Sequence, residues 1–209
     1  MKQTAKGQYG YLPAQYKWEV LKTVTMFAVS IAILVTGMVI TMHRKEGITW
    51  TESKNNILTV AAVLGMLPAS RSLISAIMFA RGKRYTCPQE VYRRLEEIKN
   101  DDRNLPLLCY DLYLTEYDKV FPVYVMAATE GELLGLLAES GDVAKAQEHI
   151  RDALQKDGQK NVTVKLYQDE EKFLDRIKAA AKDYGSAKED KEAPEKARKH
   201  MEVMLQISL

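Results

Sequence analysis

Hydrophobic and polar positions divide the chain into an apolar N-terminal part and an amphipathic C-terminal part. Residues 24–42 read VTMFAVSIAILVTGMVITM and carry no charge. A helix rises about 1.5 Å per residue, so this run nearly covers the roughly 30 Å hydrocarbon core of a bilayer. A basic stretch, His43-Arg44-Lys45, follows it directly, and a long polar segment precedes it, unlike the arrangement in a cleavable signal peptide. We therefore expect a transmembrane helix over residues 24–42.

A second apolar run covers residues 57–80 and is interrupted by Pro68 and Arg71. A central arginine costs about 2.5–3.5 kcal/mol in a membrane helix, and the surrounding apolar residues offset this by a few tenths each. Two geometries fit. In one, residues 57–77 span the bilayer and Arg71 extends toward the headgroups. In the other, residues 57–70 cross a thinned bilayer and an interfacial segment follows. Close approach of two helices is favoured by a set of small residues: Ala61, Ala62, Gly65, Ala69 and Ser72.

The distribution of basic residues predicts the orientation of this hairpin. Four lie before the first span, five follow soon after the second, and three lie between the spans. The positive-inside rule then places both termini in the cytoplasm, where the two cysteines, Cys87 and Cys109, need no disulfide. The basic residues beside the second span, expected at the membrane surface, are Arg81, Lys83 and Arg84.

We therefore expect three parts in a bacterial-type plasma membrane protein. Residues 1–22 form a juxtamembrane segment, and residues 23–80 form the transmembrane hairpin. Residues 81–209 form a cytoplasmic domain of ordinary soluble composition. The charges support this division, because residues 1–80 hold 8 basic and 3 acidic residues, whereas residues 81–209 hold 22 and 25.

The first half of the C-terminal part predicts a helix followed by a β-hairpin. Thr86 and Gln89 match a capping box, with an apolar face continuing to about residue 99. Residues 107–115 and 119–128 are rich in aromatic and β-branched side chains and predict two strands. Pro122 cannot donate to a ladder, so the second strand should be at a sheet edge or bulged.

The second half predicts mainly helices. Thr129 and Glu132 match another capping box, which predicts a helix through the following leucines. Further elements are expected as a helix from Asp142 to about 156, a strand at 162–167, a helix capped by Asp169, a polar linker at 184–193 and a short helix from Pro194. Residues 201–209 alternate as a strand would, although a helix is also compatible with them. The fold class expected after the hairpin is a mixed α+β domain.

The sequence contains no strong catalytic or ligand-binding motif. The spacing of cysteines and histidines predicts no metal site, and no phosphate-binding or nucleophile motif is present, so we expect no cofactor. His149 is expected to be a solvated side chain. The order of helices and strands invites comparison with a nuclease-like core. Asp111 could supply one carboxylate, but residues 120–126 lack the acidic-x-Lys trio, so an active nuclease is not expected. Weak catalytic candidates near the strand ends are Asp111, Tyr113, Glu130 and Glu132.

These observations leave three functional hypotheses. The preferred one is a membrane-anchored protein whose cytoplasmic domain binds a protein partner as a scaffold or accessory subunit. The alternatives are a membrane-tethered enzyme with a site built from dispersed residues, or an oligomeric, channel-like hairpin organised by Arg71. The expected contacts are the lipid bilayer and a protein partner or a second hairpin. Nucleic acid is not expected, because residues 81–209 carry a net charge of −3 (22 basic against 25 acidic).

Overall fold

The computed structural model describes residues 4–44, 49, 56–101, 106–116, 119–159, 161–187 and 193–209. Its contacts divide the chain into two compact units. One unit comprises residues 14–81, and the other combines the first thirteen residues with residues 82–209. The extreme N-terminal segment therefore belongs to the mixed α/β unit rather than to the apolar one.

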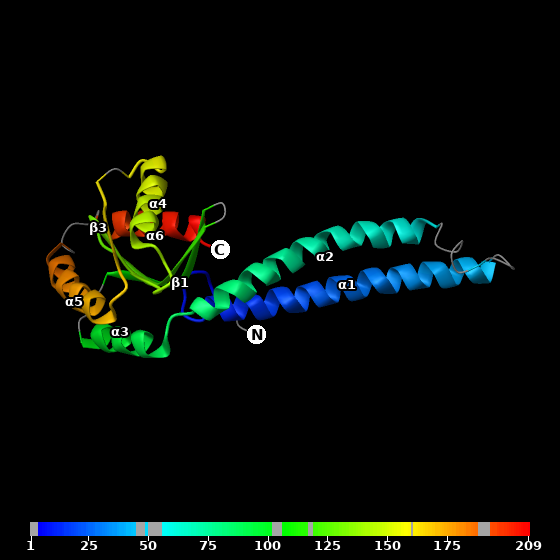
Figure 1. Cartoon of the computed structure of the whole chain (residues 1–209), viewed down its shortest axis with the longest axis horizontal. Helices are drawn as coiled ribbons and strands as arrows, with labels where there is room; N and C mark the ends of the chain where they lie inside the picture. The colour runs from blue at the N-terminus through cyan, green and yellow to red at the C-terminus, as the bar shows by residue number, and fades with distance from the viewer. Residues whose placement is uncertain are drawn as a thin grey trace. The chain divides into compact units, whose positions relative to one another are not determined.

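The apolar unit consists of two long helices, α1 (Tyr11–Arg44) and α2 (Ile57–Gly82), each of which continues a short way into the other unit. Both are long and apolar enough to cross a membrane. The apolar runs at 24–42 and 57–80 lie within them, as expected, and α2 continues as one helix through Pro68. Figure 1 shows the two helices side by side along their length.

The mixed unit contains a sheet with the strand order β1-β2-β3-β4. The strands are β1 (Leu107–Glu116), β2 (Lys119–Ala128), β3 (Glu132–Leu137) and β4 (Thr163–Tyr167). The first three form an antiparallel meander, whereas β4 pairs parallel to β3. A parallel neighbour requires a crossover connection, which is supplied by α4 (Val143–Lys156).

Helices cover both faces of the sheet (Figure 1). One core joins α4 and α6 (Ala193–Ile207) to the sheet through residues such as Leu112, Phe121 and Ile150. The other joins α3 (Gln89–Asp101) and α5 (Glu170–Ala187) through residues such as Val125 and Phe173. The expected mixed helix-and-sheet class is thus confirmed as a three-layer arrangement.

The outer edge of β1 is covered by both ends of the chain. Tyr110 N donates to Gly7 O at 2.8 Å, and Leu209 N donates to Tyr113 O at 2.9 Å. The two ends also meet, since Lys6 Nζ donates to Ser208 O at 2.7 Å. A free strand edge invites pairing with other chains, and this covering removes much of that exposure.

Two sequence-based expectations for the domain are wrong, and one alternative that the sequence left open is decided. The stretch after Thr129 is strand β3, not a helix. Thr129 Oγ1 does accept a hydrogen bond from Glu132 N at 3.0 Å, as in a capping box, but here that bond closes the turn between two strands. For residues 201–207, where the sequence was compatible with a strand or a helix, the helix alternative holds, and a bridge between Leu114 and Ser208 follows it. The expected linker begins too early, because α5 continues to Ala187.

The remaining elements agree with expectation. The predicted helices at 89–99 and 142–156 correspond to α3 and α4, and Asp142 caps α4 by accepting from Lys145 N at 3.2 Å. The β-hairpin is confirmed, and its turn at residues 117–118 lies outside the described residues. Pro122 lies in the central strand β2 rather than at an edge, and the register of β2 with β3 shifts between Val123 and Val125, next to the proline and not at it.

Candidate functional site

Asp111, the first catalytic candidate, is a buried structural clamp. Its side chain is 2% exposed, and its two oxygens accept from Gly10 N at 2.7 Å and Cys87 N at 2.8 Å. Gly10 directly precedes α1, and Cys87 follows shortly after α2. One carboxylate on β1 therefore holds the segment that enters the first long helix and the segment that leaves the second.

The backbone of β1 is specialised to aim this carboxylate. Asp111 has a φ of 56°, the left-handed region that only glycine, asparagine and aspartate adopt readily. The alternation of faces shifts there, because Cys109 and Leu112 both belong to the α4/α6 core. Burial raises the pKa of Asp111, while hydrogen bonds from the backbone of Cys87 and Gly10 act in the opposite direction. Both carboxylate oxygens of Asp111 therefore accept hydrogen bonds from backbone N–H groups.

Tyr113 also has a packing role. Its side chain is buried and stacks on Tyr85, with ring centroids 6.0 Å apart. Tyr85 lies in the short 3-10 helix η1 (Lys83–Tyr85), which directly follows α2. The ring therefore anchors this connecting segment to the sheet.

Glu130 and Glu132 lie beyond the Ala128 end of β2 and at the start of β3, whereas Asp111 is in the middle of β1. Leu107 pairs with Ala128, so Asp111 is four residues along β1 from that end, or about 13 Å. Glu130 pairs with Lys196 at 2.5 Å, and Glu132 contacts both Lys165 and Arg176. The four catalytic candidates thus do not converge on one site.

Glu132 is partly buried and has a shifted pKa. Burial would raise its pKa, but hydrogen bonds from Lys165 and Arg176 outweigh this and lower the pKa. The third strand, which the sequence did not reveal, begins Glu132-Leu133-Leu134 and so lacks the lysine of a nuclease trio. Lys165 reaches Glu132 from the neighbouring strand instead.

Two histidines lie in environments that their sequence context did not reveal. His149 is not freely solvated: its side chain is 13% exposed, packs near Phe121, and places Nδ1 3.6 Å from Glu116 Oε1. His200 is buried with Nδ1 3.1 Å from Thr129 O, and burial lowers its pKa. Each histidine lines a separate surface hollow, of about 470 and 610 Å³ respectively. Within the described residues, no cluster of three or more His, Cys, Asp or Glu side chains could hold a metal ion.

A third hollow, of about 540 Å³, lies where the parallel strands β3 and β4 end. We call it the carboxyl-edge hollow. Its lining consists of Tyr85, Pro88, Val91, Tyr124, residues 136–140, Gln168 and Glu170. Its residues come from η1, α3, β2, β3 and the start of α5, so it depends on the folded arrangement and has no local motif.

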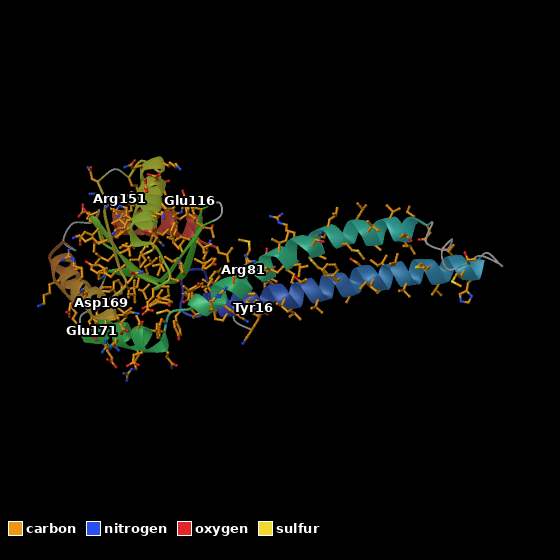
Figure 2. All side chains as sticks on the ribbon, in the orientation of Figure 1. Tyr16, Arg81, Glu116, Arg151, Asp169 and Glu171 are labelled. Carbon is orange, nitrogen blue, oxygen red and sulfur yellow. The ribbon has the colours of Figure 1, made fainter. Side chains whose placement is uncertain are left out.

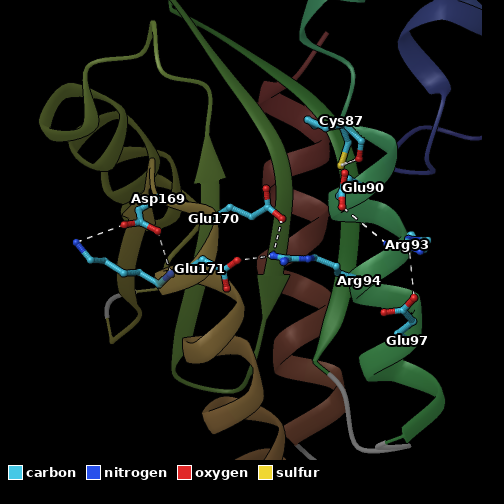
Figure 3. Close-up of polar contacts among 10 residues, drawn as sticks. Cys87, Glu90, Arg93, Arg94, Glu97, Asp169, Glu170 and Glu171 are labelled. Carbon is cyan, nitrogen blue, oxygen red and sulfur yellow. Dashed lines mark hydrogen bonds and ion pairs between the residues drawn. The ribbon is translucent and has the colours of Figure 1, made fainter.

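Ion pairs between α3 and α5 fix one side of this hollow. Arg94 Nη1 lies 3.1 Å from Glu170 Oε1 and 2.6 Å from Glu171 Oε1. Figure 3 shows Arg94 reaching from α3 to both glutamates, while Arg93 contacts Glu90 and Glu97 along its own helix. Glu170, which lines the hollow, is thereby held in place by the guanidinium group of Arg94.

The two long helices have their own polar contact. Ser72 Oγ donates to Glu19 Oε2 at 2.9 Å and lies 3.0 Å from Thr23 Oγ1. All three side chains are buried. The expected small-residue contact is present in part, because Ala62, Ala69 and Ser72 are buried while Ala61 is exposed.

Three close approaches fix the register of α1 against α2. Thr23 lies at Ser72. A side chain on Gly65 would meet Ser30 Oγ at 2.9 Å, and one on Gly37 would meet Leu58 Cβ at 2.7 Å. Each step of seven residues along α1 thus matches seven backward along α2, which is the geometry of an antiparallel heptad contact. By this register Arg71 is level with Val24, at the end of the charge-free run.

The outer surface of the helices is apolar. Among the residues that the structure describes between Trp18 and Met78, eighteen large hydrophobic side chains are exposed, including Ile57 at 82% and Leu67 at 67%. Figure 2 shows side chains projecting outward along both helices. Pro68 and Arg71 are also exposed, and no ion pair involves Arg71 among the described residues. Arg81 lies in the last turn of α2, and Lys83 and Arg84 lie in η1 directly after it.

No protein-family model, curated protein or solved structure matches this chain. Function must therefore be argued from the residues themselves.

Proposed function

We propose that this chain is a membrane-anchored module whose mixed α/β domain binds a protein partner at the cytoplasmic face. The observation that carries the membrane part is the exposure of the large apolar side chains on α1 and α2. At about 25 cal/mol per Å², leaving so many apolar side chains in water would be strongly unfavourable, whereas lipid covers them without a protein partner.

The register supports one placement in the bilayer. Residues 24–42 cover about 28 Å along α1, close to the hydrocarbon thickness. The basic side chains of Lys22 and Arg71 then lie at one boundary, and His43 lies at the other. This placement favours the geometry in which Arg71 extends to the headgroups, and it puts Trp18 in the interfacial zone where aromatic side chains are enriched.

This placement can be tested with nitroxide labels on single-cysteine variants in vesicles. A label at residue 64 should be accessible to oxygen, and one at residue 71 should be accessible to a water-soluble nickel chelate. Nickel access at residue 64 would contradict the placement.

The same register weakens the channel alternative. A conducting arginine would be expected near the bilayer centre and facing a polar path, but Arg71 is level with the boundary. The buried polar side chains Glu19, Thr23 and Ser72 contact one another near one boundary, and the buried Ser30 lies further into the span against Gly65. The exposed surface is apolar, as lipid contact requires.

Partner binding is favoured over catalysis by how the candidate residues are used. Asp111 and Tyr113 hold the segments that connect the helices to the domain, and Glu132 is neutralised by two cations. The orientation with both termini in the cytoplasm follows from the flanking basic residues. A tethered enzyme would need a different set of residues, such as those around His149 or His200.

The partner hypothesis is tested by detergent extraction of the full-length protein from its native membrane, followed by native mass spectrometry. We expect one additional polypeptide at fixed stoichiometry, retained by the full chain and lost from a variant consisting of the hairpin alone. A protein that is always recovered as a lone monomer would contradict partner binding. Hydrolysis or group transfer abolished by His149→Ala or His200→Ala would instead support the enzyme alternative.

A further inference from the structure

The carboxyl-edge hollow lies where α/β proteins commonly bind ligands. The strands β3 and β4 run parallel, so the loops that follow them, around Ser140 and Gln168, meet at one edge of the sheet. Ligands of open α/β sheets bind outside the carboxyl ends of such strands. Its volume of about 540 Å³ is within the range of small-ligand sites, and it is large enough for one or two side chains of a partner.

The lining has a definite chemical character. It combines two aromatic rings, Tyr85 and Tyr124, with two carboxylates, Glu139 and Glu170, around apolar side chains. Among the described residues, the lining contains no lysine, arginine or histidine. Tyr124 and Glu139 both line the hollow. Burial, followed by the nearby charge of Glu139, raises the pKa of Tyr124. Anionic groups would be repelled here, whereas aromatic faces and carboxylates attract cations.

The hollow is also held in shape before any ligand binds. The side-chain amide of Gln168 donates to Glu139 O at 3.1 Å and to Gly141 O at 2.8 Å, which fixes the loop after β3. Arg94 holds Glu170, and Tyr85 stacks on the buried Tyr113. A site whose walls are already ordered loses less conformational entropy on binding.

We propose that the carboxyl-edge hollow receives a cationic side chain, arginine or lysine, from a partner polypeptide. The apolar stem of such a side chain matches Leu136 and Val91, and its charged end matches Glu139 at the rim. This inference rests on the proposed partner-binding function and specifies the partner's chemistry. Of the two carboxylates, Glu139 is the informative one, because Glu170 is already paired with Arg94.

The test uses the full chain in nanodiscs of neutral lipid and a blocked five-residue peptide, glycine on both sides of one arginine. A peptide with glutamine in place of arginine is the control. Binding is followed by NMR shifts of the backbone amides of Glu139 and Ser140. We expect the arginine peptide to shift these amides and the glutamine peptide to bind at least about tenfold more weakly, as the loss of one charged hydrogen bond predicts.

Two matched variants separate local from long-range electrostatics. Glu139→Gln should weaken the arginine peptide by about five- to tenfold, because it removes the rim carboxylate. Glu148→Gln removes the same charge from the exposed face of α4, outside the hollow, and should leave affinity unchanged. Equal effects of the two variants, or equal binding of the two peptides, would overturn the inference. A stoichiometric partner recovered alongside that negative result would show that partner binding stands and only the hollow is wrong.

Discussion

Replacing Asp111 tests whether this residue joins the domain to the segments flanking the long helices. Asp111→Gly and Asp111→Ala both remove the two acceptor oxygens and leave the N–H groups of Gly10 and Cys87 without their partner. An unpaired buried donor costs about 1–3 kcal/mol, so we expect either change to lower the free energy of unfolding by about 2–4 kcal/mol.

The two substitutions should also differ from each other. Alanine must adopt the φ of 56° that glycine adopts freely, a strain of about 1–2 kcal/mol that the greater unfolded-state entropy of glycine partly offsets. Asp111→Ala should therefore be less stable than Asp111→Gly by about 0.5–1 kcal/mol. On α5 the exposed Asp175 provides the opposite control, because alanine is more stable than glycine by about 1 kcal/mol inside a helix.

The assay is thermal unfolding of the full chain in detergent, followed by near-ultraviolet circular dichroism. Tyr9, Tyr92 and Tyr110 form a ring cluster beside this region, so the tyrosine signal should report its loss. For a domain of this size the expected fall in Tm is about 5–10 °C. A change below about 1 °C would refute the clamp, and alanine matching glycine at position 111 would refute the backbone strain.

Three further predictions concern pH and helix packing. Because the pKa of Asp111 is raised in the folded protein, its favourable contribution to stability is complete below its unfolded pKa and is lost as the pH rises through its folded pKa. The difference in unfolding free energy between wild type and Asp111→Asn should therefore narrow from about pH 4 upward. A difference that does not change with pH in urea unfolding would contradict this. The pKa of Glu132 is lowered, so its contribution to stability is present above its unfolded pKa and is lost on acidification. Glu132→Gln should therefore reduce the loss of unfolding free energy on acidification by up to about 1 kcal/mol. An unaltered midpoint of acid unfolding would count against this. Gly65→Leu should clash with Ser30, separate α1 from α2 and lower the free energy of unfolding by about 1–3 kcal/mol. Ala61→Leu, on the exposed surface, should change it little. Equal losses of stability for the two variants in detergent-denaturation curves would disprove the register.

The sequence predicts best those elements whose signal is long or locally well marked. The apolar runs at 24–42 and 57–80 exceed the length of an ordinary core helix, and the structure contains a long helix over each. The β-hairpin and α4 also followed from local composition and capping. In these segments the local preference and the tertiary environment agree, so one pattern is sufficient.

The failures arose where tertiary pairing overrode a local preference. Thr129 and Glu132 form the hydrogen bond of a capping box, but Leu133 and Leu134 face opposite cores and pair with β4, which makes a strand more favourable. The C-terminal residues were compatible with a strand or a helix, and they form a helix whose Met201 and Met204 pack in the core with the sheet. The local pattern in a sequence does not show which other elements of the fold a segment will pack against.

The role of Asp111 was beyond sequence reasoning for a different reason. Its partners Gly10 and Cys87 are far away along the chain, and neither carries a side-chain motif that would indicate backbone donors. The carboxyl-edge hollow is similarly assembled from five separate elements. The local feature that marks Asp111 is its positive φ within a strand, and this is visible only in the structure.

Alkaline carbonate extraction of membranes that contain the full-length chain tests the central claim most directly. High pH strips peripheral proteins, whereas a chain held by two lipid-covered helices remains in the bilayer. We predict that the protein sediments with the membranes after ultracentrifugation and enters the supernatant only when detergent is added. Release into the supernatant by carbonate alone would contradict the account.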